Sequence, residues 1–184
     1  MAKSRRELGV ALSNQLLSVD FLPDFWYIFV EIFLLITTSM IDCTFCSIAR
    51  GESSAEILYQ NEHAVAILDI NPIHCGHVLV LPRQHAETFL EVPETELGGL
   101  IRATQIVSRA VVNSLNPPGF NIFSNNGKAA GQSVFHFHFH ITPRYADDNI
   151  RFILQLKKYS GDEMAAYAER IRQKINSDHI HTKP

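Results

Sequence analysis

Short apolar runs and two helical patterns predict a mixed α and β fold for this chain of 184 residues. Three observations support that prediction. Several short apolar runs, bounded by Pro, Gly and Asn, are typical of strands. Residues 93–116 repeat apolar side chains at helical spacing, with glutamates in the first turn. A second helical pattern near the C-terminus begins with a capping signal at Ser160.

Length, charge and cysteine content restrict the possible classes of protein. The length suits one globular domain, with or without an appendage. The formal net charge of −3 gives no sign of polyanion binding, so no nucleic-acid partner is expected. Three cysteines, Cys43, Cys46 and Cys75, are too few for a disulfide framework. The C-x-x-C pair instead suggests a metal or redox pair in a reducing cytosol, and we expect a cytoplasmic protein.

The first 40 residues differ from the rest of the chain. Residues 21–40 are strongly apolar, but Pro23 and Glu31 make a poor match to a transmembrane helix. The apolar run also begins too far downstream for a secretory signal. Three interpretations remain open: a helix packed on the domain, a membrane-surface anchor, or sequence upstream of a more natural start at Met40. We favour the third, so membrane association through residues 21–40 is not the preferred interpretation.

The expected elements follow in chain order. A short helical turn in CTFCSIARG is closed by Gly51. A hairpin is predicted from AEILYQ and HAVAILDI, and NPIHCG forms a turn. The strand HVLVLPRQH is ended by Pro82. The long helix over residues 93–116 is broken by PPG, and the strands FNIFSNNG and VFHFHFHITPRY follow. Residues 151–184 are expected to form a helical extension and a frayed tail, NSDHIHTKP.

The motif that carries the chemistry alternates three histidines with three phenylalanines: Phe135, His136, Phe137, His138, Phe139 and His140. Successive side chains of a strand point to opposite faces, so the imidazoles are expected on one face and the phenyl rings on the other. Three buried imidazoles without a function would each need their own hydrogen-bond partner. The pattern therefore favours metal ligation or covalent catalysis.

Two further signals accompany the alternating motif. Cys43 and Cys46 have the spacing of a tetrahedral zinc site that two histidines would complete, with a redox pair or two plain thiols as alternatives. The Gly-rich turn GKAAGQS, which ends at Ser133, resembles an anion-binding nest, although it lacks the G-K-[ST] ending of a P-loop. A nucleophilic imidazole beside a phosphate cradle suits nucleotidyl or phosphoryl transfer.

With these motifs in this order, the sequence resembles the histidine triad (HIT) superfamily, whose signature His-x-His-x-His plus apolar residues reads here as HFHFHIT. The resemblance covers roughly residues 41–150, and the helical extension resembles that of bacterial members that hydrolyse nucleoside phosphoramidates. It implies an α+β domain with a roughly five-stranded antiparallel sheet, one long helix and a C-terminal helix. It also implies a homodimer whose sheets join across the two-fold axis. Residues 1–40 inherit nothing from it.

The resemblance implies a nucleotide hydrolase or transferase acting at the α-phosphate of nucleoside 5′-phosphoramidates or related nucleotidyl conjugates. His138 would be the nucleophile, and water would release a nucleoside monophosphate from the nucleotidyl-histidine intermediate. His140 and Ser133 would stabilise charge on the phosphate. The alternatives are a dinucleoside polyphosphate hydrolase, a nucleotide- or zinc-binding regulatory protein without significant turnover, and a membrane-tethered version.

The resemblance also implies a set of nucleotide-binding residues: Asp69, Ile70, His77, Asn125, Gly131, Gln132 and Ser133. Asp69 would hydrogen-bond the ribose hydroxyls, and Ile70 would pack on the sugar or base. Asn125 and the backbone of the Gly131–Ser133 segment would contact the phosphate, and His77 would lie near the active site.

A structural zinc ion is the cofactor that the resemblance implies. Its ligands would be Cys43, Cys46, His85 and His136, a closed set of two thiolates and two imidazoles. His74 and Cys75 match no ligand of the family, and we expect them at the surface or in a loop.

Overall fold

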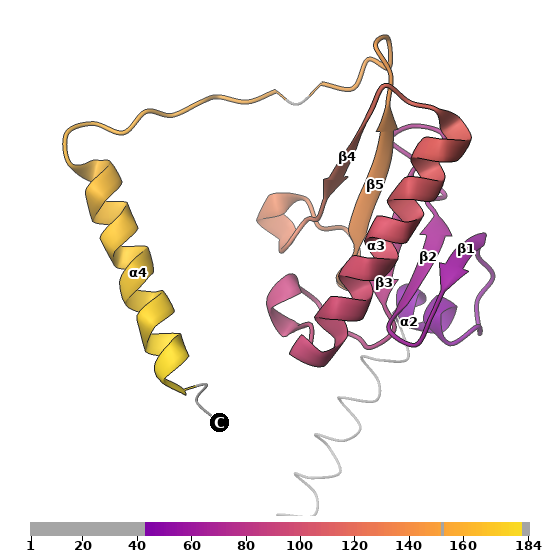
Figure 1. Ribbon diagram of the computed structural model, residues 1–184, viewed down its shortest axis with the longest axis horizontal. Helices are drawn as coiled ribbons and strands as arrows, with labels where there is room; N and C mark the ends of the chain where they lie inside the picture. The colour runs from indigo at the N-terminus through magenta and orange to yellow at the C-terminus, as the bar shows by residue number, and fades with distance from the viewer. Residues whose placement is uncertain (1–42, 152, 182–184) are drawn as a thin grey trace, which may run out of the picture. The chain divides into compact units, whose positions relative to one another are not determined.

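The computed structural model describes residues 43–151 and 153–181, which divide into two compact units between Asp148 and Asn149 (Figure 1). The interpretations that concern residues 1–40 lie outside the described residues. Within the described part, no helix is both long and apolar enough to cross a membrane.

A five-stranded antiparallel sheet forms the centre of the first unit, with the strand order β1-β2-β3-β5-β4. The strands are β1 (Ile57–Gln60), β2 (Ala64–Leu68), β3 (Val78–Pro82), β4 (Gly119–Phe123) and β5 (Phe139–Arg144). Together with the helices, this sheet confirms the predicted α+β class and the number of strands.

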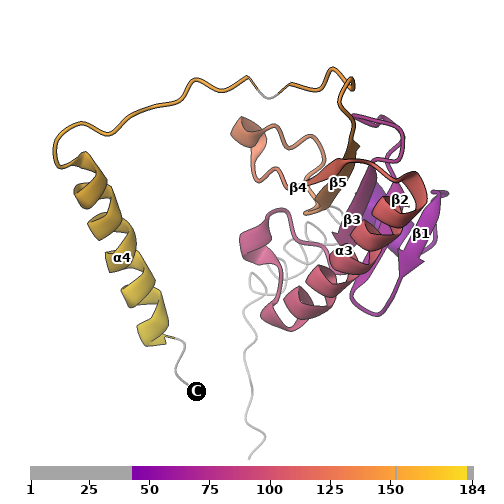
Figure 2. The same ribbon diagram turned by 45° about the horizontal axis from the view of Figure 1, so that its top comes forward.

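Two helices cover the sheet, one on each face, and Figure 2 shows the long helix lying along its face. Alternate residues of β2 and β3 point to opposite faces, and both sets are buried, which explains their continuous apolar sequences. The long helix α3 (Glu94–Leu115) packs Leu100 and Val107 against one face. The short helix α2 (Thr44–Ala49) packs Phe45 and Ile48 against the other.

The strand that follows the histidine motif begins later than the sequence suggests. β5 starts at Phe139, so His136 and His138 lie before it in irregular backbone. The neighbouring strand β3 explains this late start. Val80 pairs with Phe139, so continued pairing would place Pro82 opposite residue 137. Proline has no N–H to continue the ladder. Phe137 donates its N–H to the carbonyl of Ala86 instead, at 2.6 Å.

The three phenylalanines of the motif do not share one environment. Phe137 is fully buried and Phe139 packs at the edge of the same core, but Phe135 is 46% exposed. The expectation of one common phenylalanine face is therefore wrong for Phe135, because the chain has not yet joined the sheet at that point.

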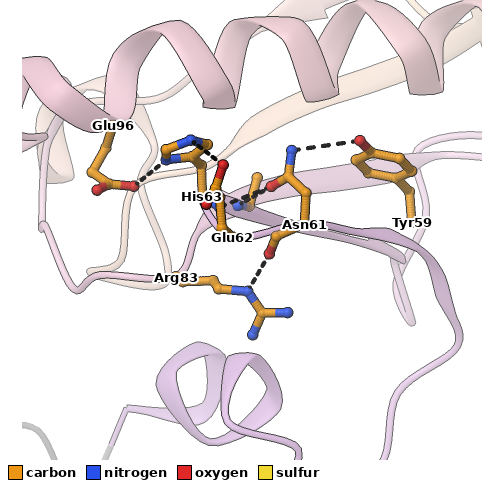
Figure 3. Close-up of polar contacts among 7 residues, drawn as sticks. Tyr59, Asn61, Glu62, His63, Arg83 and Glu96 are labelled. Atoms are coloured by element: carbon orange, nitrogen blue, oxygen red, sulfur yellow. Dashed lines mark hydrogen bonds and ion pairs between the residues drawn. The ribbon is translucent and has the colours of Figure 1, made fainter.

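A polar cluster at the β1–β2 turn connects both helices with the sheet (Figure 3). Nδ1 of His63 lies 2.9 Å from Oε2 of Glu96 on α3. Arg83, just after β3, donates to the carbonyl of Asn61 in the turn and to the carbonyl of Ala49 at the end of α2. The short helix is therefore held in place by a buried apolar face and by a guanidinium at its C-terminus.

The second unit consists of an irregular segment and α4 (Glu163–His181). The carboxylate of Glu163 accepts hydrogen bonds from the N–H and the hydroxyl of Ser160, at 2.8 and 2.9 Å. This is the Glu-to-N–H half of the predicted capping box. The helix continues through residues 176–181, so the frayed tail predicted for this segment is wrong up to His181.

Candidate functional site

The four side chains expected to bind zinc come together beside α2: Cys43, Cys46, His85 and His136. Their donor atoms all lie within 4.8 Å of one another. Nδ1 of His136 is 3.4 Å from Sγ of Cys43 and 3.5 Å from Sγ of Cys46, and Nδ1 of His85 is 3.3 Å from Sγ of Cys46. Zinc bonds of about 2.3 Å to sulfur and about 2.0 Å to nitrogen place neighbouring tetrahedral donors about 3.5 Å apart. The four residues therefore fit a zinc ion.

Hydrogen bonding around this cluster prepares one imidazole for a metal. Nε2 of His136 donates to the carbonyl of Pro82 at 2.9 Å, which leaves the lone pair of Nδ1 to face the thiols. Burial lowers the pKa of His136 to about 4, so its imidazole is neutral at physiological pH. Burial and the nearby Cys43 raise the pKa of the Cys46 thiol, so metal binding must displace a proton from it.

A cavity of about 450 Å³ lies next to the same helix. Its walls combine apolar side chains with a few polar ones, as is typical of sites for small organic ligands. The lining residues include Phe45, Ile48, Ile67, Asp69, Ile70, Leu79, Ser133, His138 and His140.

His138 presents a defined nitrogen in this cavity. Its Nδ1 donates to the carbonyl of His136 at 2.7 Å, so Nε2 carries the lone pair. The ring of Phe45 contacts it edge-on, with centroids 5.2 Å apart. Burial lowers the pKa of His138, although the His136 carbonyl opposes this shift. A buried, neutral imidazole of fixed tautomer has the properties of a nucleophile.

His140 is held on two sides. Its ring stacks on that of Phe123 with centroids 4.5 Å apart, and its Nδ1 lies 2.9 Å from Nε2 of His77. Its Nε2 is buried and has no hydrogen-bond partner among the described residues. Burial lowers the pKa of His140 to about 4. An unpaired buried polar atom beside a cavity is expected to meet its partner on a ligand.

The connection between β4 and β5 forms one rim of the site, and Gln132 fixes its shape. The Gln132 side chain is buried; its Oε1 accepts the N–H of Gly127, and its Nε2 donates to the carbonyls of Glu87 and Val134. Its amide group is therefore occupied by the loop, and only its backbone is left for a ligand.

Of the other residues expected to bind a nucleotide, Asp69, Ile70 and Ser133 line the cavity, whereas Asn125 and Gly131 do not. Ser133 is exposed on its rim, and Ile70 is 91% exposed there. Gly131 has a φ of +87°, a conformation that favours glycine, and its carbonyl lies 3.5 Å from Nδ2 of Asn125. Oδ1 of Asp69 accepts the N–H of Asn71. His77 lies behind His140 and does not itself line the cavity.

Sequence reasoning missed the contribution of α2 to this cavity. Phe45 and Ile48 line it at the helical spacing i, i+3, and they flank Cys46. Apolar residues next to the C-x-x-C pair were the available signal. His74 and Cys75 lie outside both groups; the ring of His74 packs on that of Tyr145, with centroids 4.9 Å apart.

Comparisons with known proteins agree with this geometry. The HIT domain family matches residues 50–147. An uncharacterized HIT-like protein of Methanocaldococcus jannaschii is 47% identical over 106 residues, which is 58% of this chain and 81% of the relative. An adenylylsulfatase of Arabidopsis thaliana is 39% identical over 119 residues, 65% of this chain and 60% of the relative. The crystal structure of a zinc-bound histidine triad family protein from Mycobacterium smegmatis superposes with a TM-score of 0.57 at 32% identity, covering 76% of this chain and 99% of that one.

Proposed function

The chain belongs to the HIT domain family, and we propose from this premise that it is a nucleotide hydrolase or transferase acting at the α-phosphate of nucleoside 5′-phosphoramidates or related nucleotidyl conjugates. The observation that carries the proposal is the hydrogen bond from Nδ1 of His138 to the His136 carbonyl. It leaves a lone pair on Nε2 in a cavity large enough for a nucleotide moiety.

The reaction has two displacements at phosphorus. Nε2 of His138 forms a bond to the α-phosphorus, while the bond from phosphorus to the leaving nitrogen breaks and the departing amine takes up a proton from solvent water. Water then attacks the phosphorus and releases a proton to solvent, and the P–N bond to His138 breaks to release the nucleoside monophosphate and restore the neutral imidazole. Splitting one difficult displacement into two easier ones is the general advantage of covalent catalysis.

The remaining side chains position the substrate. His140 and Ser133 stabilise phosphate charge, together with the backbone of Gly131 and Gln132. Asn125 acts near the phosphate. This assignment gives Nε2 of His140 the hydrogen-bond partner that it lacks among the described residues.

The sugar and base occupy the other end of the cavity in this proposal. Asp69 accepts hydrogen bonds from the ribose hydroxyls, and Ile70 packs against the sugar or base. Phe45 and Ile48 provide an apolar wall for the base.

Zinc is the cofactor in this proposal, held by Cys43, Cys46, His85 and His136. When bound, it supplies a structural cross-link that fixes α2 to the segment before β5. We also propose a cytoplasmic location, where thiols stay reduced until metal binds them.

The assembly in this proposal is a homodimer in which two sheets join across a two-fold axis. β4 lies at one edge of the sheet and exposes Phe120 and Ile122, which are 42% and 46% accessible. An exposed apolar edge strand favours pairing with a second copy. Light scattering of the native protein and of Ile122→Lys tests this assignment, since a charge at the edge should yield a monomer.

One substrate panel tests the proposed activity. Native protein is incubated with adenosine 5′-phosphoramidate, adenylyl sulfate and a diadenosine polyphosphate, and release of the monophosphate is followed by chromatography. Preferred turnover of the phosphoramidate supports the proposal, whereas preferred turnover of the dinucleotide favours the polyphosphate hydrolase. If the protein binds a nucleotide but turns over none of these substrates, the result favours the regulatory alternative.

A further inference from the structure

We propose that a second cavity beside the candidate site binds the leaving group of the substrate, and that Glu87 in its wall selects leaving amines that carry a further positive charge. The inference rests on the proposed function, because it names the substrate class of that same reaction. The positive charge belongs to a second group of the amine, since the nitrogen bound to phosphorus in a phosphoramidate is uncharged. Diamines and basic amino acids are leaving groups of this class.

The second cavity has a volume of about 310 Å³ and lies next to the candidate zinc cluster. We call it the leaving-group cavity, and its lining residues are Cys43, Thr44, His85, Glu87, Ser133, Val134 and Phe135. Three of them, Thr44, Ser133 and Val134, also line the cavity proposed for the nucleotide. Thr44 and Ser133 are exposed, so the two cavities meet at an accessible boundary and not across a buried wall. One ligand can therefore extend from one cavity into the other.

The geometry of displacement at phosphorus directs the leaving group across this boundary. The attacking and leaving atoms lie roughly in line, on opposite sides of the phosphorus. Among the described lining residues, His138 and His140 belong to the nucleotide cavity alone, whereas Ser133 belongs to both. A phosphate that is held by Ser133 and attacked by His138 from the nucleotide cavity therefore turns its leaving group toward the other cavity.

Glu87 determines the charge of the leaving-group cavity. No lysine or arginine is found among its described lining residues. Cys43 and His85 belong to the candidate zinc cluster, in which two thiolates balance the charge of the ion. The carboxylate of Glu87 has no hydrogen-bond or ion-pair partner in the part of the chain that the structure describes. Its negative charge is therefore available to a cation on the ligand.

The main chain of Glu87 is held on both sides. Its N–H donates to Oε2 of Glu91 at 2.8 Å, and its carbonyl accepts a hydrogen bond from Nε2 of Gln132 at 2.6 Å. Gln132 is buried and immediately precedes Ser133 in the chain. One amide side chain thus ties the backbone of Glu87 to the loop that carries Ser133. The fold therefore defines where Glu87 stands relative to the boundary between the cavities.

Phe135 supplies an apolar surface in the same cavity. Its ring is 46% exposed, whereas Phe137 and Phe139 pack in or against the core. A place in the wall of the leaving-group cavity gives this accessible ring a function. The methylene chain of an amine packs on such a surface while its terminal cation stays beside the ring or the carboxylate. The combination suits an organic cation better than an inorganic one.

A comparison of leaving groups tests the inference in the native protein. The substrates are adenosine 5′-phosphoramidates of 1,5-diaminopentane, hexylamine and 6-aminohexanoate, which share one methylene chain and end in an ammonium, a methyl and a carboxylate group. An ion pair at an accessible position is weak, so we expect kcat/KM to fall roughly threefold from ammonium to methyl and again from methyl to carboxylate. Measurement at about 0.15 M salt screens charges elsewhere on the surface.

Three variants separate Glu87 from the overall charge of the protein. Glu87→Gln keeps the shape of the side chain, and we expect it to remove most of the preference for the ammonium. Glu87→Lys should make the carboxylate the preferred leaving group. Glu94→Gln is the matched control, because Glu94 is exposed at the start of α3 and lines neither cavity. A native preference in Glu87→Gln, or an equal loss in Glu94→Gln, would overturn the assignment of Glu87.

Equal kcat/KM for the three substrates in the native protein would remove the leaving-group cavity and keep the proposed function. Failure of the proposed function gives a different result, namely no turnover of any of them. Calorimetry with adenosine 5′-alkylphosphonates of the same chains, in which a P–C bond resists displacement, then decides the inference by binding alone. Tighter binding of the ammonium-terminated analogue by the native protein, but not by Glu87→Gln, supports the cavity. Equal Kd values for the three analogues would contradict it.

Discussion

The candidate metal cluster and the cavity proposed for the nucleotide are built from histidines only two residues apart, yet they are organised in opposite ways. In the metal cluster, the donor atoms of four residues converge on one another within 4.8 Å. In the cavity, the nitrogens of His138 and His140 that remain available face a space of about 450 Å³. One arrangement is closed and suits a structural ion, and the other keeps its donors for a ligand.

The difference depends on which ring nitrogen is bound to the protein. His136 donates through Nε2 to the Pro82 carbonyl and keeps Nδ1, while His138 donates through Nδ1 to the His136 carbonyl and keeps Nε2. His140 also has its Nδ1 engaged, by His77. The same residue type thus acquires different chemistry from the hydrogen bond on its far side.

The largest effect is predicted for a substitution that removes the nucleophile from the cavity and leaves the metal cluster intact. We expect His138→Ala to reduce kcat at least about 10⁴-fold, because a lost nucleophile removes the covalent pathway. Zinc content should stay at the native value. Steady-state kinetics and metal analysis check both, with His74→Gln as a control outside the site. Activity of His138→Ala near that of the control would disprove the assignment.

The second prediction concerns the loss of one ligand from the metal cluster. We expect Cys46→Ser to abolish stoichiometric zinc and lower Tm by roughly 15 °C, because a ligand present at about 1,000 times its Kd stabilises the native state by about 4 kcal/mol. Differential scanning calorimetry and metal analysis measure the change, with exposed Cys75→Ser as the matched control. Native zinc content in Cys46→Ser would refute the ligand set.

The third prediction concerns Phe45, the ring shared by the two regions. Its ring makes T-shaped contacts with the rings of both His136 and His138, with centroids 5.9 and 5.2 Å apart. We expect Phe45→Leu to keep its zinc and to lose about 10-fold in kcat, because the nucleophile loses a rigid neighbour. Unchanged kcat in a folded, zinc-loaded variant would show that the two regions are mechanically independent.

The smallest predicted effect concerns the difference in pKa between the more accessible His63 and the buried histidines. Glu96 raises the pKa of His63, whereas burial lowers the pKa of His136 and His138. A raised pKa stabilises the fold below the unfolded value of about 6.5, and this contribution is lost as pH rises through the folded pKa. Urea unfolding should therefore show that His63→Gln loses more stability at pH 5.5 than at pH 9. An equal loss at both would contradict the ion pair.

Residue spacing was sufficient to single out the three histidines and the C-x-x-C pair, whereas His85 and His136 were named as candidate zinc ligands only through the resemblance to the HIT family. The sequence did not predict which nitrogen each imidazole presents. That property depends on carbonyls of Pro82 and His136 whose positions follow from the end of the β3–β5 ladder. The wall formed by Phe45 and Ile48 also depends on how α2 packs, because their apolar character beside the C-x-x-C pair indicates burial but not which part of the molecule they face.

The central claim is that hydrogen bonding on the far side of each imidazole assigns its function, and the tautomer of His138 tests it most directly. Nitrogen-15 NMR of the native, zinc-loaded protein at neutral pH reports which ring nitrogen carries the proton. The account predicts a proton on Nδ1 of His138 and a bare Nε2. A proton on Nε2 with a bare Nδ1 would contradict it, because the nitrogen assigned to attack phosphorus would then have no lone pair.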